Sequence, residues 1–490
     1  MSKPMFTSIE AYKNISYKKI EPVLSHTTDK FKSNLEEVLD LLSLRDGMTL
    51  SFHHHLRNGD GVLNLVMDYI IRRNIKNITL AASSLFPVHG LIVDYIEKGH
   101  ITKIISSYIN GPVATAISKG LLKDQVIMQT HGGRARSIET GELVIDIAFI
   151  GLSCADKNGN GNGKYGQNAF GPVGYSNADM MYAKNVVVIT DNLVDEVKED
   201  EIQSKYVDYV VVVDSIGKQE SIVSGTTQIT KDPIGIKIAK DTTKVLDALG
   251  LIKPGFSMQT GAGGVSLAVA NEVYNIMSER NIKGSFISGG ITAYFVKMLE
   301  ENKMDKLFDV QCFDLEAVRS YRENKNHIGM SASKYANPFD NPVVNNLDFT
   351  ILGATEIDLN FNVNVTTDSY GAIIGGSGGH ADSAYGAKVT IITTQIMKSR
   401  MPIIKDRVTA ITTPGDSVDI LVTERGIAVN PKRTDLINCL SGKIKLYSIK
   451  ELQDICYTIT GKPMNIEKGN QTIGIIEYRD GSIIDYLYKK

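Results

Sequence analysis

An internal repeat limits most strongly what this chain can fold into. The segment that begins at Asp146 matches the segment that begins at Asp348, at an offset of 202 residues, with six identities over 17 positions. Composition alone would give roughly one or two identities. The identical pairs are Asp146/Asp348, Gly151/Gly353, Asp156/Asp358, Asn158/Asn360, Asn160/Asn362 and Asn162/Asn364.

A second match supports the first. Arg73-Asn-Ile-Lys76 and Arg280-Asn-Ile-Lys283 each close a predicted helix ahead of a predicted strand, at an offset of 207 residues. Chance is one explanation of the two matches. We interpret them instead as two homologous halves that divide near residue 225, and we expect an active site in the cleft between the halves.

Short apolar runs alternate with amphipathic segments from residue 47 onward, and this alternation predicts an α/β fold with mostly parallel sheets. Residues 1–44 are polar and lysine-rich, with a helical pattern of leucines near their end. We therefore expect an N-terminal helical arm at 1–44, a first α/β domain at 45–225 and a second at 226–490. The strand-like runs are 78–82, 104–108, 145–150, 186–189 and 210–213, and the helix-like segments are 62–73, 88–98 and 111–122.

Charge and composition exclude several classes of protein. The chain has 53 Lys and Arg against 55 Asp and Glu, a net charge of −2, and this balance lacks the basic character typical of nucleic-acid binding. Its apolar runs are far shorter than the ~20 residues that span a bilayer, and its N-terminus does not resemble a signal peptide. The four cysteines are scattered without a CxxC pair. We expect a cytoplasmic protein with no membrane segment and no nucleic-acid partner.

A first glycine-rich turn holds Gly261, Gly263 and Gly264. It lies between a predicted strand at 255–258 and a predicted helix at 265–277. Backbone N–H groups at the start of a helix are free to bind a phosphate or the oxyanion that forms on a thioester. A tight turn that needs glycine for its backbone angles is the alternative.

A second glycine-rich turn spans Gly375–Gly379, with four glycines in five residues ahead of a helix-like stretch at 381–387. Each glycine loses extra backbone entropy on folding, so stability does not explain this density. Close approach of a ligand to the backbone of Gly376, Gly378 and Gly379 explains it better. A mobile surface loop is the alternative.

Histidine and arginine gather in two further turns. His53, His54 and His55 follow a predicted strand and precede Arg57. Neighbours in an extended segment point to opposite faces, so the three histidines lack metal-ligand spacing and we expect no metal. Histidine with arginine is better suited to a polycarboxylate or a phosphate. Arg134 lies in a similar basic turn, which is equally compatible with a solvated loop.

Glu356 is the acidic residue whose position is most informative. It follows the predicted buried strand 349–352, and the ends of central strands are where α/β sheets bind ligands. It could act as a nucleophile or a base, or it could cap a loop or pair with an arginine. At the offset of 202 residues, its equivalent in the first half is Cys154, which suggests that only the second half uses a carboxylate here.

Together these segments resemble the CoA-transferase superfamily, and most closely its citrate lyase alpha-subunit branch. The resemblance runs from about residue 35 to residue 490. It implies two tandem homologous open α/β CoA-transferase domains with mostly parallel sheets, plus the N-terminal helical arm. The most specific segments are SFHHHLRNGD (51–60), HGGRARSIETGEL (131–143), GFSMQTGAGGVSLAV (255–269), ATEIDLNFNVNV (354–365), GGSGGHADSAYGAK (375–388) and SVDILVTERGIAVNP (417–431).

The resemblance implies a transferase that exchanges acyl groups on a thioester. An acetyl thioester, carried by a small acyl-carrier subunit or by CoA, and citrate would give the citryl thioester and acetate. The branch is understood to work through a ternary complex and a mixed anhydride, whereas many relatives form a covalent thioester on a glutamate. A generic acyl-CoA:carboxylate CoA-transferase that uses Glu356 in this way is therefore the alternative, and a non-catalytic effector-binding module is a more distant one.

The predicted site follows from this chemistry. The expected partners are citrate and acetate, the beta (citryl lyase) and gamma (acyl carrier) subunits of citrate lyase, and further copies in an oligomer. No permanently bound cofactor is expected, because the CoA-type thioester is a substrate. The predicted catalytic residues are Glu356, Gly376, Gly378 and Gly379; the substrate-binding residues are His53, His54, Arg57, Arg134 and His380; and the thioester- or phosphate-binding residues are Gly261, Gly263 and Gly264.

Overall fold

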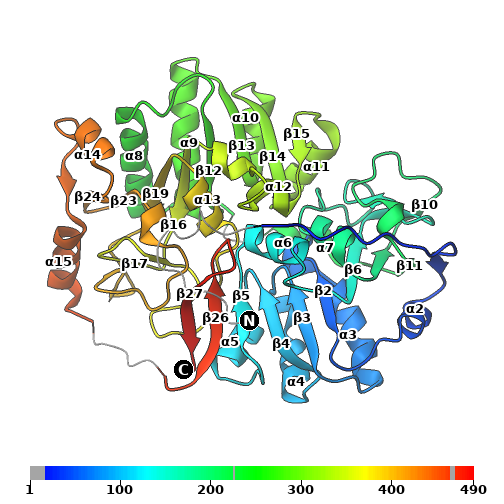
Figure 1. The fold of residues 1–490 in the computed structure, drawn as a ribbon. Coiled ribbons are helices and arrows are strands. Elements are labelled where there is room, and N and C mark those ends of the chain that lie inside the picture. Colours follow the sequence, from blue (N-terminus) through cyan, green and yellow to red (C-terminus); the bar gives the residue numbers. More distant parts are fainter. Residues whose placement is uncertain (1–16, 224–226, 464–468) are drawn as a thin grey trace.

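Two large, mostly parallel β-sheets organise the molecule, each flanked by helices (Figure 1). The computed structural model describes residues 17–223, 227–463 and 469–490. Within these residues, no helix combines the length and the apolar character needed to span a bilayer. The helices are α2 (Leu35–Leu41), α3 (Val62–Arg72), α4 (Ile92–Glu97), α5 (Pro112–Ser118), α6 (His131–Glu139), α7 (Asn177–Tyr182), α8 (Pro233–Ala248), α9 (Gly264–Glu279), α10 (Ala293–Glu300), α11 (Leu315–Glu323), α12 (Ala332–Ala336), α13 (His380–Gly386), α14 (Thr434–Leu440) and α15 (Ile449–Thr460).

The first sheet has ten strands and the second has nine. In spatial order the first is β1 (Phe31–Lys32), β11 (Tyr209–Val212), β9 (Val186–Thr190), β6 (Ile147–Leu152), β2 (Thr49–Phe52), β3 (Ile78–Ala82), β4 (Ile101–Ser106), β5 (Val126–Met128), β26 (Thr472–Glu477) and β27 (Ile483–Tyr488). The second is β15 (His327–Gly329), β14 (Met304–Cys312), β13 (Gly284–Ile291), β12 (Ser257–Thr260), β16 (Phe349–Gly353), β19 (Val389–Thr393), β23 (Ile420–Thr423), β24 (Gly426–Val429) and β25 (Leu446–Tyr447).

Three small sheets complete the strands. One is β10 (Leu193–Val194), β7 (Cys154–Asp156) and β8 (Gly161–Asn162). The second is β18 (Val363–Asn364), β17 (Glu356–Asp358) and β22 (Ile404–Lys405), and the third is β20 (Met397–Lys398) with β21 (Met401–Pro402).

The two large sheets repeat one strand order, so the prediction of two homologous α/β halves is confirmed. The run β11-β9-β6-β2-β3-β4-β5 of the first sheet corresponds to β23-β19-β16-β12-β13-β14-β15 of the second. Every neighbouring pair within both runs is parallel. The division expected near residue 225 falls at residues 224–226, outside the described part of the chain.

The repeated aspartates have the same role in both halves. Asp156 Oδ1 accepts hydrogen bonds from the backbone N–H groups two and four residues ahead, at 2.9 and 3.1 Å, and Asp358 Oδ1 accepts the equivalent bonds at 2.9 and 3.0 Å. Each Oδ2 also accepts from the asparagine side chain four residues ahead, at 3.0 and 3.1 Å. The shared Asp-x-Asn-x-Asn pattern therefore encodes the same side-chain-stabilised turn twice.

The shorter match closes two equivalent helices. Asn74 follows α3 with φ of 54°, and Asn281 follows α9 with φ of 52°, in the left-handed region that asparagine tolerates better than most residues. Each turn leads into the next strand, β3 or β13. The predicted elements are otherwise close to the observed ones, although the strand expected at 104–108 begins at Ile101 because pairing with Ile78 extends it.

Both ends of the described chain contribute to the first sheet. β1, in the predicted N-terminal arm, pairs with β11, and β26 pairs with β5 through Gly474↔Val126. The hairpin β26–β27 belongs to the sequence range 226–490 that was expected to form the second domain. Its strands nevertheless extend the first sheet, as the red hairpin beside β5 shows in Figure 1.

One buried carboxylate joins three parts of the chain. Asp382, in α13 of the second half, accepts hydrogen bonds from Thr130 Oγ1 and Gly132 N of the first half, both at 3.0 Å. Arg479, in the turn of the C-terminal hairpin, donates to the same carboxylate from Nε at 2.9 Å. Asp382 and Arg479 are fully buried, so this contact fixes the two halves and the hairpin together.

The repeated turns should contribute similar stability. Asp156→Ala and Asp358→Ala each leave partly buried backbone donors without their acceptor, so each should lower the free energy of unfolding by about 1–3 kcal/mol. Urea denaturation measures this, with Asp195→Ala at an exposed position as the control. A loss at only one of the two turns would contradict their equivalence.

Candidate active site

The carboxyl ends of the parallel strands place the predicted site residues at two equivalent positions. Strand order reverses between β2 and β6 in the first sheet and between β12 and β16 in the second. Ligands of open α/β sheets bind at such reversal points. His53 directly follows β2, Gly261 directly follows β12, and Glu356 lies three residues after β16.

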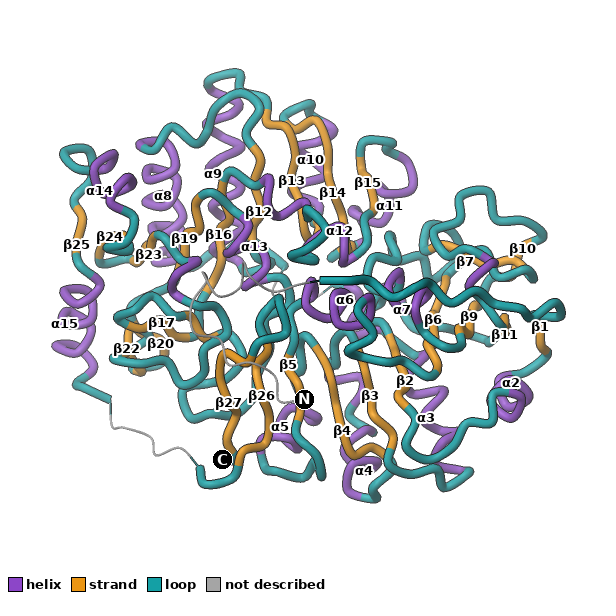
Figure 2. The backbone as a smooth tube through the Cα atoms, viewed as in Figure 1, coloured by secondary structure: helices purple, strands orange, loops and turns teal. Residues whose placement is uncertain are grey.

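The carboxyl ends of the strands in the two sheets face each other across the boundary between the halves (Figure 2). Gln311 Nε2, on β14, donates to the His54 carbonyl at 2.7 Å. His131 N donates to the Gly378 carbonyl at 2.9 Å, and Gly378 N donates to the Ser107 carbonyl at 3.1 Å. Residues far apart in the sequence therefore meet at one interface.

The three adjacent histidines point to different partners. His53 Nε2 lies 3.1 Å from Asp179 Oδ2, and His54 Nδ1 lies 2.6 Å from Ser83 Oγ. The His55 ring instead stacks on Phe170, with centroids 4.9 Å apart. They do not converge on one point.

His54 belongs to a stack of rings at the interface. The Tyr175 ring lies 4.5 Å from both His54 and His131, and its hydroxyl is 3.2 Å from His131 Nε2. Burial lowers the pKa of His131 to about 3, with a further contribution from Arg134. Burial also lowers the pKa of His54, with contributions from the neighbouring histidines and Arg57. The stack is therefore neutral near pH 7 and offers hydrogen bonds rather than charge.

The two predicted arginines have different surroundings. Arg134 donates to both oxygens of Asp179, at 2.8 and 2.9 Å, and to Ser51 Oγ at 2.8 Å. Burial acts to raise the pKa of Asp179, but Arg134 and His53 outweigh it and hold the pKa below its usual range. This buried pair favours a positioning role for Arg134 rather than direct contact with a substrate.

Arg57 is half-buried at the boundary between the halves. Its guanidinium carbon lies 4.4 Å from the ring centroid of Phe313, from the second half, and 5.8 Å from that of Phe86. Burial lowers the pKa of Arg57. The position of this cation at the interface matches the negative charge of a substrate such as a carboxylate.

Glu356 is held by a complete set of hydrogen-bond donors. Lys405 Nζ pairs with Oε1, and Thr409 Oγ1 donates to the same oxygen at 3.1 Å. Thr409 N and Asn364 Nδ2 donate to Oε2 at 2.7 and 3.0 Å. Burial acts to raise the pKa of Glu356, but Lys405 and the other donors lower it below the usual range. The carboxylate is therefore ionised and firmly positioned.

The Gly375–Gly379 turn packs against the first half. A Cβ atom on Gly376 would lie 2.3 Å from the Ser107 carbonyl oxygen, and one on Gly379 would lie 2.2 Å from the Tyr335 hydroxyl. Gly378 has φ of 51°, and its N–H is already bonded to Ser107. Close approach to protein atoms thus explains why glycine is needed here, where the sequence had suggested close approach of a ligand.

The Gly261–Gly264 turn is more open. A Cβ atom on Gly263 would meet nothing within 4 Å, and one on Gly261 would meet only atoms 3.7 Å away or more. Gly263 is the N-cap of the 16-residue helix α9 and provides no capping side chain. Packing therefore does not explain Gly261 and Gly263, and the start of α9 can receive an anion. Gly264 differs, because its Cβ would lie 2.8 Å from the Gln228 carbonyl oxygen.

His380 links the second glycine turn to β16. Its Nδ1 lies 2.7 Å from Thr413 Oγ1 and its Nε2 lies 2.9 Å from the Gly353 carbonyl oxygen. The structure thus brings His54 close to the Gly378 turn, through His131 and Tyr175, and brings His380 to the strand that leads to Glu356. Arg134 lies with Asp179 and His53 instead.

Several residues of the site had no distinct signal in the sequence. Lys405 and Thr409 contact Glu356 from positions about 50 residues further along the chain, because β22 pairs in parallel with β17. Tyr175 is an ordinary tyrosine until the fold places it between two histidines. His131 was visible as part of a basic turn, although its role in the stack was not.

Comparison with known proteins identifies the fold and then the family. The alpha subunit of malonate decarboxylase from Acinetobacter baumannii superposes with a TM-score of 0.64 at 16% identity, covering 88% of each chain. This likeness and the paired open sheets assign the chain to the CoA-transferase fold class. The family model of the citrate lyase alpha subunit matches residues 28–490, so the chain belongs to that family.

Individual relatives agree with this assignment. The citrate lyase alpha chain of Haemophilus influenzae is 45% identical over 94% of this chain and 93% of its own length. That of Escherichia coli is 43% identical over 94% and 91%. The citrate lyase alpha subunit of Streptococcus mutans, solved in complex with citrate, has a TM-score of 0.93 at 43% identity, covering 97% of this chain and 94% of that one.

The close packing of Gly376 has a measurable consequence. Gly376→Ala places a methyl group against the Ser107 carbonyl, so the backbone must shift and the free energy of unfolding should fall by about 1–3 kcal/mol. Gly353→Ala is the matched control, because a Cβ there meets nothing within 4 Å. An unchanged stability with a transferase rate about 100- to 1000-fold lower would instead indicate a backbone donor to an oxyanion.

His380 should make stability depend on pH. Desolvation of the imidazole lowers the pKa of His380 to about 4, from an ordinary value of 6.5. Between these values the unfolded chain binds a proton that the folded chain does not, so the free energy of unfolding falls as the pH falls. Between these two pKa values, His380 changes the free energy of unfolding by at most about 1.4 kcal/mol per pH unit.

Urea titrations from pH 7 to about pH 4 test this effect. His380→Gln should flatten the pH dependence by that amount relative to the wild type, and His26→Gln, at an exposed position, is the control. Equal slopes in the wild type and His380→Gln would contradict a neutral His380 in the folded state.

Proposed function

We propose that this chain exchanges acyl groups on a thioester as the alpha subunit of citrate lyase. An acetyl thioester, on an acyl-carrier protein or on CoA, and citrate give the citryl thioester and acetate. Membership of the citrate lyase alpha-subunit family supports this proposal, as does the citrate in the related Streptococcus mutans structure.

The reaction proceeds in two balanced steps. A citrate carboxylate oxygen attacks the acetyl carbonyl carbon, the C–S bond breaks, and the thiolate leaves a mixed anhydride of citrate and acetate. The thiolate then attacks the citryl carbonyl carbon, and acetate leaves with the oxygen that citrate supplied. Each step passes through an oxyanion that aligned N–H groups stabilise.

The state of Glu356 is the observation that carries the direct route. A nucleophilic carboxylate must approach a carbonyl carbon, but Glu356 is buried and its two oxygens already accept from Lys405, Thr409 and Asn364. Leaving those donors would cost free energy that direct attack by citrate does not require. In this route Glu356 acts as a positioning residue for the β17 turn.

The covalent route through Glu356 is the alternative. Lys405 and the other donors lower the pKa of Glu356, which keeps the carboxylate ionised, as a nucleophile must be. In that case Glu356 would attack the acetyl carbonyl and release the thiolate. The thiolate would then attack the Glu356 carbonyl, so that acetate leaves and the thioester is on Glu356 before citrate reacts. Both routes have the same overall products, so they differ only in which carboxylate, that of citrate or that of Glu356, supplies the new oxygen atom of acetate.

The remaining site residues fit this reaction. Arg57 and the ring stack with His54 lie at the boundary where a tricarboxylate would bind, and Arg134 would position His53 through Asp179. The start of α9, at Gly263 and Gly264, is the stronger candidate for the oxyanion or the thioester phosphate, whereas the Gly261 N–H already donates to the Ile351 carbonyl at 2.8 Å. Gly376 and Gly379 are weaker candidates because their turn packs on the first half, and Gly378 is weakest since its N–H is occupied.

The proposed partners follow from the reaction. A beta (citryl lyase) subunit would cleave the citryl thioester, and a gamma (acyl carrier) subunit would carry the thiol of a CoA-derived group. We further propose a cytoplasmic complex in which this chain is present in several copies.

An exchange assay tests the proposal. With citrate and acetyl-CoA, the purified chain should form citryl-CoA and acetate but no oxaloacetate. The same result is expected with EDTA, because exchange needs positioning and oxyanion stabilisation, both available from backbone amides and cationic side chains. Liquid chromatography with mass detection measures all five compounds.

Two controls make the assay decisive. Omission of citrate should abolish acetate release, which excludes simple thioester hydrolysis. Arg57→Lys should raise KM for citrate while KM for acetyl-CoA stays unchanged, because an ammonium does not replace a guanidinium that binds carboxylate through two bonds. Oxaloacetate formation by this chain alone, or loss of exchange with EDTA, would contradict the proposal.

A further inference from the structure

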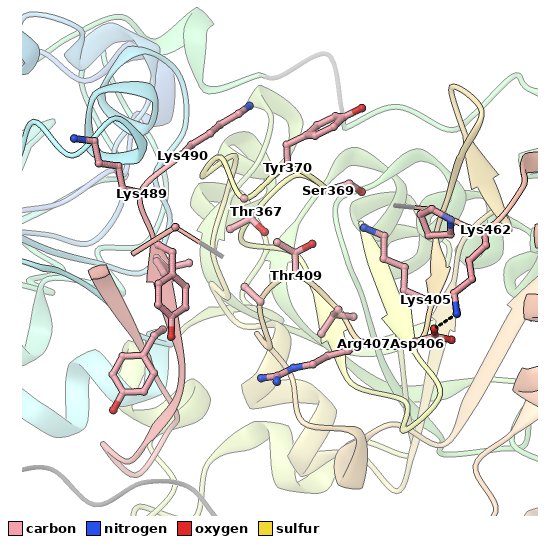
Figure 3. Close-up of a pocket in the computed structure, with 18 of the residues that line it drawn as sticks. Thr367, Ser369, Tyr370, Lys405, Asp406, Arg407, Thr409, Lys462, Lys489 and Lys490 are labelled. Carbon is pink, nitrogen blue, oxygen red and sulfur yellow. Dashed lines mark ion pairs between the residues drawn. The ribbon is translucent and has the colours of Figure 1, made fainter. Parts of the chain in front are cut away.

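A cluster of buried side chains in the second half has no part in the proposed reaction. It consists of Asp309 and Cys312, at the carboxyl end of β14, and His327, at the start of β15. One donor atom from each residue lies within 4.8 Å of the other two. The pocket that Lys405 lines beside Glu356 is a different place, and the thioester of the proposed function accounts for it (Figure 3). The cluster therefore needs an explanation of its own.

The three side chains converge on a single oxygen atom. Cys312 Sγ lies 3.0 Å and His327 Nε2 lies 3.1 Å from Asp309 Oδ2. Tetrahedral zinc, with Zn–S of about 2.3 Å and Zn–N and Zn–O of about 2.0 Å, separates sulfur from oxygen by about 3.5 Å and nitrogen from oxygen by about 3.3 Å. These two separations would need to grow by only about half an ångström or less. Thiolate, imidazole and carboxylate are also the ligand types that zinc prefers.

A β-bulge places Asp309 and Cys312 on one face of β14. Residues three apart in a regular strand point to opposite faces. The pairing of β14 with β13 skips Val310, which is an extra residue in β14. Asp309 and Cys312 consequently lie opposite residues 289 and 291 of β13, which are two positions apart and share a face. The equivalent strand of the first half, β4, carries neither aspartate nor cysteine, so the duplicated fold does not itself require the pair.

The charge of Asp309 also favours a cation. Among the described residues, Asp309 has no lysine or arginine partner, and the basic side chain that pairs with it is His327. A second carboxylate lies behind the cluster, because the Tyr321 ring is 5.5 Å from that of His327 and the Tyr321 hydroxyl donates to Glu201 at 2.9 Å. Burial of a carboxylate without a counter-charge is costly. A divalent ion would balance Asp309, and a protonated His327 is the alternative.

Further hydrogen bonds orient the ligand atoms. Ser320 Oγ lies 3.1 Å from His327 Nδ1, which leaves Nε2 directed at Asp309. Gln311 N donates to Asp309 Oδ1 at 2.8 Å, so Oδ2 is the oxygen that faces the other two ligands. Partners of this kind are typical of zinc sites, where they fix the orientation of the imidazole and of the carboxylate.

We propose that Asp309, Cys312 and His327 bind a zinc ion. The Cys312 thiol loses its proton to solvent as the Zn–S bond forms. Three protein ligands leave one position of the tetrahedron for a water molecule or a further donor. The ion stabilises the structure and takes no part in acyl exchange. Because its ligands are buried, it leaves slowly, so exchange continues during a short assay with EDTA.

The site lies at the boundary between the two halves. A Cβ atom on Gly171, in the first half, would lie 2.4 Å from Cys312 Sγ, so the first half covers the thiol. Gln311, between two of the ligands in sequence, donates to the His54 carbonyl of the first half at 2.7 Å. The zinc ion therefore fixes the strand end that holds the histidine turn in place.

Metal analysis of the purified full chain tests the site. Inductively coupled plasma mass spectrometry should find one zinc ion per wild-type chain after dialysis. Ser320→Ala should weaken zinc binding about 10- to 100-fold, as loss of an outer partner does, and Cys312→Ser should weaken it by at least about 100-fold. Cys456→Ser, at an equally buried cysteine, is the matched control and should keep the zinc.

Cobalt is the second probe, because it reports the type of ligand. The wild-type chain loaded with Co²⁺ should show the near-ultraviolet absorption of a cobalt–thiolate bond. Cys456→Ser should retain this absorption and Cys312→Ser should lose it. Added zinc should also raise the Tm of the metal-free wild type, because it binds the folded state, but not the Tm of Cys312→Ser.

Two results would overturn the site. Absence of zinc from the purified chain, together with no cobalt–thiolate absorption, would mean that the three side chains only hydrogen-bond to one another. Zinc that Cys312→Ser and Ser320→Ala leave in place in folded protein would be bound elsewhere. Neither measurement depends on acyl exchange, so this inference and the proposed function can fail independently.

Discussion

The buried Asp382 carboxylate is the contact on which the arrangement of the two halves depends. It lies in the second half, accepts hydrogen bonds from Thr130 and Gly132 in the first half, and pairs with Arg479 of the C-terminal hairpin. Asp179 has the equivalent place in the first half, where it pairs with Arg134. The two helices that follow the equivalent loops thus each carry a buried aspartate with an arginine partner. Loss of one partner from such a pair is costly, because the remaining charge stays buried.

Much of the fold could be predicted because it is encoded locally. The alternation of apolar runs and amphipathic segments gave the α/β class, and the Asp-x-Asn-x-Asn turns marked the repeat because their hydrogen bonds join residues two and four apart. The pairing of β26 with β5 joins Gly474 to Val126, and no local pattern indicates which distant strand will be a neighbour. The C-terminal hairpin was therefore assigned to the second half by sequence position alone.

The candidate site was predictable in its location and less so in its contacts. The ends of β2 and β12 were identified from glycine, histidine and arginine next to predicted strands. The density of glycine at Gly375–Gly379 was correctly seen as close approach, yet the approaching atoms belong to Ser107 and Tyr335. A glycine indicates that space beside its backbone is limited, but it does not indicate which atoms occupy that space. Lys405 could not be found in this way, since only the pairing of β17 with β22 brings it to Glu356.

The comparison of the two halves explains where chemistry was added to a duplicated scaffold. Cys154 and Glu356 occupy equivalent positions at the start of β7 and β17, but only Glu356 has Lys405 and Thr409 beside it. The first half contributes the ring stack of His54, Tyr175 and His131. In the proposed reaction, the second half would hold the thioester and the boundary would hold the carboxylate substrate. The two would meet where the carboxyl ends of the strands face each other.

The path of oxygen in the first turnover tests the proposed direct exchange most directly. Citrate labelled with ¹⁸O in its carboxylates is mixed with acetyl-CoA and an excess of the purified chain, and the acetate released is analysed by mass spectrometry. Direct attack by citrate predicts acetate that carries one ¹⁸O atom, because the bridging oxygen of the anhydride leaves with the acetyl group. Unlabelled acetate in the first turnover would contradict this account, because its new oxygen would then come from the Glu356 carboxylate.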